Sequence, residues 1–136
     1  MTTPEFDLGR VANIPARRDW DLEITLYTPD ATAESAAYAT VLAGGDLVRF
    51  QLWAVAGEEP IIEATDITPS ANGTSIVIET RGEEDTTPAR VTIKLTAADT
   101  DIAASTYNFI LDVQDASDNR WQPACQGKIR ITPTPA

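Results

Sequence analysis

Runs in which apolar and polar residues alternate recur along most of this chain. A period of two places every second side chain on the same face of an extended strand. Turn signals such as Asn72-Gly73 separate the runs. The alternating runs begin at Trp20, Val48, Thr74, Val91, Tyr107 and Trp121, and a shorter apolar run follows Pro60. This pattern predicts an all-β, antiparallel β-sandwich of about seven to nine strands.

A polar segment separates the run that ends at Leu95 from the run that begins at Tyr107. It predicts one short helical turn near 97–103. The hydroxyl of Thr96 can cap the N–H of Asp99, whose carboxylate suits the first turn of a helix. We expect this turn to carry the chain from one sheet to the other. The ring of Tyr107 then fills the corner, and its hydroxyl bonds to nearby backbone.

The length of 136 residues corresponds to one domain. Residues 1–18 contain two prolines and a basic pair, and we expect them to form an N-terminal arm. The sandwich is predicted over 19–132. Residues 133–136 form a tail, because proline lacks the N–H that a sheet requires. The alanine-rich stretch 30–45 fits either a long loop or a short helix.

The balance of charge and the lack of histidine narrow the range of possible functions. There are 21 Asp and Glu residues against 10 Lys and Arg residues, which disfavours binding to nucleic acid or to an anionic membrane. No histidine is present, so nucleophilic triads that use it are excluded. The only cysteine, Cys125, has no histidine to activate it, and we expect a small buried side chain. The N-terminus lacks the pattern of a signal peptide, which predicts synthesis in a cytosol.

Two kinds of acidic cluster could carry chemistry. The first could bind Ca²⁺ and comprises Asp112, Asp115, Asp118 and Asn119. Its order does not match a calcium loop, and an Asp- and Asn-rich hairpin turn is the favoured explanation. The second kind, Glu58-Glu59 and Glu83-Glu84-Asp85, could supply paired carboxylates for hydrolysis. Both clusters lie beside glycine in predicted loops, so we expect no catalytic site, metal or cofactor.

Several apolar residues fall on the wrong side of their strand or outside the strands. Tryptophan and tyrosine are frequent in binding interfaces, because they bury much area and lose little entropy. Either loops cover these residues or they contact other proteins; exposed strand edges offer a further route to association. The interface candidates are Phe6, Leu8, Val11, Tyr27, Trp53, Val77 and Ile110.

The order of several motifs along the chain is similar to that in a known family. The motifs are Asp46–Trp53, Asn72-Gly73, Val91–Thr100, Tyr107-Asn108-Phe109 and Gly127–Ile131. Over roughly residues 17–132 the chain resembles the immunoglobulin-like modules of tailed-phage virion proteins. It is most similar to the N-terminal domain of phage baseplate upper proteins and of related tail-fibre adaptors. Ser105-Thr106 stands where that family usually has glycine before the tyrosine.

The resemblance implies a non-catalytic structural protein of the virion, assembled in the host cytoplasm. Its partners would be copies of itself and other baseplate, tail, neck or capsid proteins, with no nucleic acid or membrane. The alternative is a glycan-binding module for host attachment, with Trp53 or Trp121 as the stacking platform. A small hydrolase that uses Glu58 and Glu59 is the least supported hypothesis.

Overall fold

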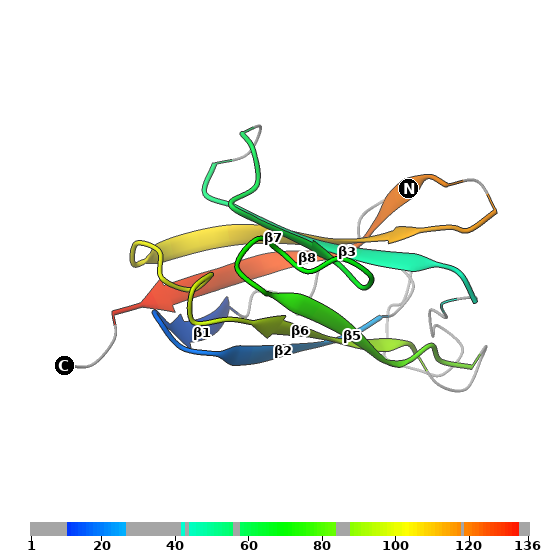
Figure 1. Cartoon of the computed structure of the whole chain (residues 1–136), viewed down its shortest axis with the longest axis horizontal. Helices are drawn as coiled ribbons and strands as arrows, with labels where there is room; N and C mark the ends of the chain where they lie inside the picture. The colour runs from blue at the N-terminus through cyan, green and yellow to red at the C-terminus, as the bar shows by residue number, and fades with distance from the viewer. Residues whose placement is uncertain are drawn as a thin grey trace.

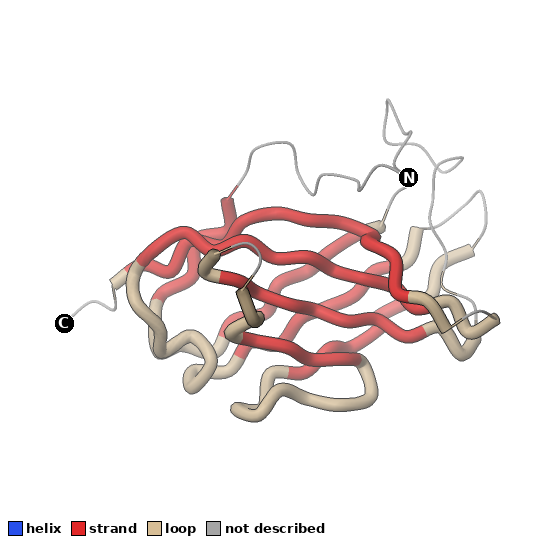
Figure 2. Tube along the Cα trace, turned by 90° about the horizontal axis from the view of Figure 1, so that it is seen from above, coloured by secondary structure: helices blue, strands red, loops and turns tan. Residues whose placement is uncertain are grey.

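The computed structural model describes residues 11–26, 42, 44–55, 58–83, 88–117 and 119–133. This part of the chain is all-β and contains no helix (Figure 2). The prediction of an all-β chain is therefore confirmed. The strands are β1 (Val11–Pro15), β2 (Trp20–Thr25), β3 (Leu47–Trp53), β4 (Ile62–Thr65), β5 (Ser75–Thr80), β6 (Arg90–Leu95), β7 (Ser105–Gln114) and β8 (Trp121–Thr132).

The strands form two sheets that lie one above the other in a sandwich-like arrangement (Figure 1). One sheet has five strands in the order β1-β8-β7-β3-β4, and the other has three in the order β2-β6-β5. Their facing sides share one apolar core. Phe50 and Phe109 lie at its centre, fully buried, with ring centroids 5.7 Å apart. Ile24 and Ile93 complete the core from the three-stranded sheet.

The alternation in the sequence sets which side chains reach the core. In β3, Val48, Phe50 and Leu52 are buried, whereas the residues between them are half-buried on the opposite side. Trp20 departs from this pattern, since its side chain is 40% exposed. It is the first residue of β2, at an end of the sheet, where the core no longer covers a ring of that size.

The first strand corrects two expectations. Val11–Pro15 lie in the sheet instead of in an arm, and they pair parallel with Lys128–Thr132, so the five-stranded sheet is mixed and not purely antiparallel. Ile14 is fully buried beneath this pairing. A five-residue run beside proline gives little alternation to recognise, and its partner lies more than a hundred residues away. Residues 1–10 of the expected arm lie outside the described residues.

The connection between β6 and β7 makes a turn at 97–100 and not a helix over 97–103. One helical hydrogen bond forms, from the amide of Thr100 to the carbonyl of Thr96 (3.0 Å). The amide of Ile102 then bonds to Thr100, which ends the helical geometry. The predicted cap is confirmed, because the amide of Asp99 donates to Thr96 Oγ1 (3.3 Å).

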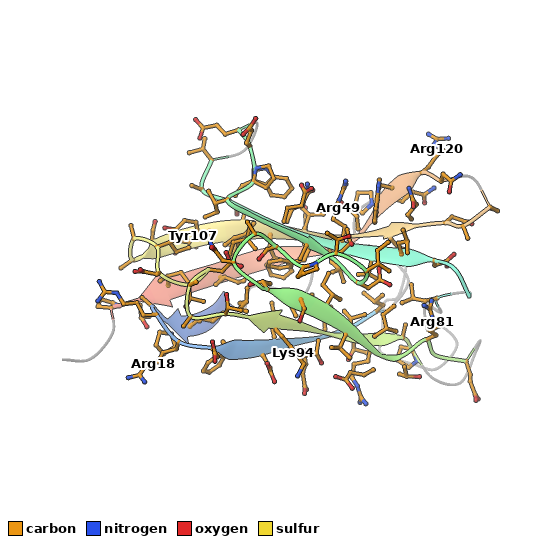
Figure 3. The ribbon with its side chains drawn as sticks, in the orientation of Figure 1. Arg18, Arg49, Arg81, Lys94, Tyr107 and Arg120 are labelled. Carbon is orange, nitrogen blue, oxygen red and sulfur yellow. The ribbon has the colours of Figure 1, made fainter. Side chains whose placement is uncertain are left out.

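The corner predicted around Tyr107 is also confirmed. Its ring is buried, and its hydroxyl donates to the carbonyl of Ala103 (2.6 Å). Figure 3 shows Tyr107 near the end of the sandwich where this connection lies. The bond fixes the chain just before it enters β7, so the ring fills the space at the end of the core.

A polar network ties three connections together at this end of the molecule. The carboxylate of Asp99 is almost fully buried and accepts hydrogen bonds from Ser70 Oγ (2.5 Å) and Asn72 Nδ2 (3.2 Å). Thr100 Oγ1 donates to the carbonyl of Arg18 (2.8 Å), in the turn between β1 and β2. Because β1 belongs to one sheet and β2 to the other, the network holds both sheets in place.

We expect Asp99→Ala to lower the free energy of unfolding by about 2–3 kcal/mol, because it removes a nearly buried, charged acceptor from the half-buried Ser70 and the exposed Asn72. Asp101→Ala is the matched control. Asp101 pairs with Arg17 at the surface, where the two side chains are 61% and 72% exposed, and we expect a loss of at most about 0.5 kcal/mol. Urea denaturation followed by circular dichroism measures both; equal losses would contradict the role given to Asp99.

Candidate interaction surface

The side chains of the five-stranded sheet that point away from the core form a surface that we call the outer face. The pairing of β3, β4, β7 and β8 arranges them in rows across the sheet. Successive rows hold Trp121, Gln114 and Leu47; then Pro123, Asp112, Arg49 and Thr65; then Gln126, Ile110, Gln51 and Glu63; then Lys128, Asn108 and Trp53; and finally Arg130 and Thr106.

Arg49 is held on this face by contacts with two neighbouring side chains. Its Nη2 and Nε both donate to Asp112 Oδ2, at 2.7 and 3.1 Å, and its guanidinium carbon lies 4.4 Å from the centroid of the Trp121 ring. The pair is largely shielded from water, with side chains 24% and 9% exposed. Figure 3 shows Arg49 on the outer side of the five-stranded sheet. An arginine fixed by a carboxylate and an aromatic ring is the kind of residue that dominates protein interfaces.

Two of the predicted interface residues meet on the outer face. Trp53 lies opposite Asn108, and Ile110 lies opposite Gln51, so Trp53 and Ile110 are diagonal neighbours on adjacent strands. Both side chains are half-buried. One aromatic and one aliphatic side chain therefore leave apolar area on the same face as Arg49.

The other predicted residues do not join this cluster. Val77 lies on the three-stranded sheet, with its side chain 37% exposed and facing away from the core. Val11 is in β1 beside Lys128, and only its backbone is described. Phe6, Leu8 and Tyr27 lie outside the described residues.

Three exposed apolar residues around β4 were not among the interface residues predicted from the sequence. Val55, Ile61 and Ile67 are 55%, 44% and 70% exposed. Val55 and Ile61 flank the loop from β3 to β4, which projects beyond the sheet in Figure 1. Ile61 was expected inside a strand, but β4 begins one residue later. Alternation could not show this, because the run is too short to fix which residue starts the strand.

The outer face is less acidic than the rest of the chain. It carries the cations Arg49, Lys128 and Arg130, and its two carboxylates both have donors on the same face: Arg49 bonds Asp112, and Gln51 Nε2 donates to Glu63 (2.5 Å). Lys128 and Arg130 are exposed and take part in no ion pair among the described residues. In a chain of net charge −11, this face therefore presents positive charge beside tryptophan.

The opposite outer surface, on the three-stranded sheet, differs. Its outward charged residues are Asp21, Glu23, Glu79, Arg90 and Lys94. Figure 3 shows Lys94 on the side of the molecule away from Arg49. Acids outnumber bases there, and no tryptophan lies among the outward residues of its paired strands.

The acidic residues in and beside the β7–β8 turn accept hydrogen bonds from other residues of the chain. Asp115 Oδ1 accepts from the amide and the hydroxyl of Ser117, both at 2.7 Å, and Asp112 is held by Arg49. Asn119 has a φ of 56°, which closes the turn. These contacts agree with a hairpin turn; Asp118 lies outside the described residues.

The structure describes only some of the other residues that were considered for catalysis or metal binding. Glu58 and Glu59 are exposed in the β3–β4 loop, whereas Glu84 and Asp85 lie outside the described residues. Cys125 is in β8, and its side chain is not described. Within the described ranges, no three His, Cys, Asp or Glu side chains gather in a way that could hold a metal ion.

No model of a known protein family matches this chain. A comparison with curated proteins also finds no match. In the part of the chain that the structure describes, no helix is long and apolar enough to cross a membrane. The functional interpretation of the outer face therefore rests on its geometry alone.

Replacing Arg49 with lysine removes the planar group that stacks on Trp121 and the second donor to Asp112. We expect Arg49→Lys to lower the free energy of unfolding by about 1 kcal/mol and to shift the tryptophan emission. The matched control is Arg130→Lys, at an exposed position on the same face, for which we expect no measurable change. Denaturation monitored by fluorescence tests both variants; an unchanged Arg49→Lys would show that the stack does not contribute to stability.

The pKa of Asp115 lies below its ordinary value of 3.8, chiefly because of the hydrogen bond from the Ser117 amide and secondly because of that from its hydroxyl. Ser117→Ala removes only the hydroxyl, so we expect the pKa to rise part of the way towards 3.8. A folded-state pKa below the unfolded value stabilises the fold above the unfolded pKa, and this contribution is lost as the pH falls through the folded pKa. NMR titration of the Asp115 carboxyl carbon measures the shift, with Ser75→Ala as the control that should leave it unchanged.

Proposed function

We propose that this chain is an immunoglobulin-like assembly module of a tailed-phage virion. The strand order supports the immunoglobulin-like topology: β2, β6 and β5 occupy the positions of strands B, E and D, and β8, β7, β3 and β4 those of G, F, C and C′. The hydroxyl of Tyr107, bonded to Ala103 at the start of β7, matches the tyrosine corner of that fold.

The core differs from that of antibody domains in a way the sequence explains. Phe109 stands two residues after the tyrosine, where those domains have the second cysteine of their disulfide. Its ring packs against Phe50 of β3 instead. Apolar packing replaces the cross-link, which suits a protein that is made and assembled in a reducing cytosol.

The outer face is the single observation that carries the assembly role. It combines an arginine held by two neighbours, two tryptophans and an isoleucine with exposed cations, and aromatic residues and arginine are enriched in binding interfaces. Arg49 covers one side of the Trp121 ring, which leaves less of it for a sugar to stack on and disfavours Trp121 as a platform for glycan binding. The assignment to a virion rests on the sequence resemblance.

The proposal is tested on particles of the phage whose genome encodes the chain. We expect mass spectrometry of gradient-purified particles to detect the chain at a fixed ratio to the other structural proteins, and gold-labelled antibody to mark one position. A major capsid protein provides the internal standard. Expression in infected cells without incorporation into particles would contradict the proposal, and so would a coding sequence that lies outside any phage genome.

A further inference from the structure

We propose that the outer face binds the segment Glu5-Phe6-Asp7-Leu8 of a second copy of this chain. The inference rests on the assembly role proposed above and deepens it, since it names the partner and the contact. The contact is heterologous, because a segment of one copy engages a face of the next. Such contacts generate rings or open filaments according to the rotation between neighbouring copies.

The charges of the outer face favour an acidic partner. Its two carboxylates already accept hydrogen bonds from neighbours, whereas Lys128 and Arg130 are exposed and unpaired among the described residues. A chain with 21 acids and 10 bases could readily pair those two cations internally. Local positive charge on an acidic protein attracts an acidic segment, and long Lys and Arg side chains can reach carboxylates at its flanks.

The segment 5–8 supplies the complementary groups. It holds two acids, Glu5 and Asp7, next to two apolar side chains, Phe6 and Leu8. The acids suit Lys128 and Arg130, and the apolar side chains suit the area formed by Trp53 and Ile110 in the adjacent rows. Aromatic anchors are enriched at interface centres, whereas charge pairs lie at the polar rim around them.

The position of β1 favours a second copy over the same copy. Val11 pairs with Lys128 at the edge of the sheet, and three strand spacings, about 14 Å, separate β1 from Trp53 on β3. Five residues separate Phe6 from Val11, which is about 17 Å of fully extended chain. The same chain would therefore have to be drawn taut across β8 and β7, and this costs conformational entropy. A segment from a second copy approaches the face without that constraint, and its cost is the translational and rotational entropy of association.

The test uses full-length chains with exchanged charges. At concentrations from about 10 µM to 1 mM, we expect the mass from light scattering to rise above the 14.7 kDa of one copy. Lys128→Glu with Arg130→Glu, and separately Glu5→Lys with Asp7→Lys, should each weaken association at least tenfold. Mixing the two variants should restore it, because each then offers one complementary half. Circular dichroism verifies that both variants fold.

Arg90→Glu with Lys94→Glu is the matched control, since it changes the net charge equally on the opposite surface. We expect it to associate as the unmodified chain does. A mass of 14.7 kDa at every concentration would overturn the inference, and so would a mixture of exchanged chains that stays monomeric. Equal weakening by the control would attribute association to net charge and also overturn it. None of these results bears on whether the chain is found in virions, which the particle experiment decides.

Discussion

The fold depends on how the chain ends one sheet and begins the other between β6 and β7. There the chain must leave a buried strand without leaving backbone groups unpaired in the core. Thr96 caps the turn, Asp99 accepts from Ser70 and Asn72, and the Tyr107 hydroxyl bonds to Ala103. With the bond from Thr100 Oγ1 to the carbonyl of Arg18, they join the connections β1–β2, β4–β5 and β6–β7. The two sheets are thereby fixed relative to each other at one end, and the shared core fixes them along their length.

A rigid sandwich gives its two outer surfaces independent characters. The inward positions of β3 and β7 must be apolar to fill the core, but the outward positions are free to serve contacts. On β3 and β7 they carry Arg49, Trp53, Ile110 and Asp112. On the three-stranded sheet they are mostly charged and polar. The difference between the surfaces supports the directional contact proposed above, in which one face binds and the other meets solvent.

The proposed self-assembly also accounts for the balance of charge. A net charge of −11 keeps separate copies apart through long-range repulsion. A local patch of opposite sign can overcome that repulsion only at short range, when the complementary segment and apolar groups dock together. Assembly would then depend on correct docking, and non-specific aggregation of the same strands would be suppressed.

The sequence by itself determined the all-β class, the inward residues such as Phe50 and Phe109, the capping by Thr96 and the corner at Tyr107. Each of these follows from local chemistry: a period of two, a hydroxyl three residues before an amide, or a ring beside a turn. Only the tertiary structure decided that Val11–Pro15 pair parallel with β8, because that partner is distant in the chain. The stack of Arg49 on Trp121 was likewise hidden, since it depends on the register of three strands. Register is a property of pairing across the sheet, and no single strand encodes it.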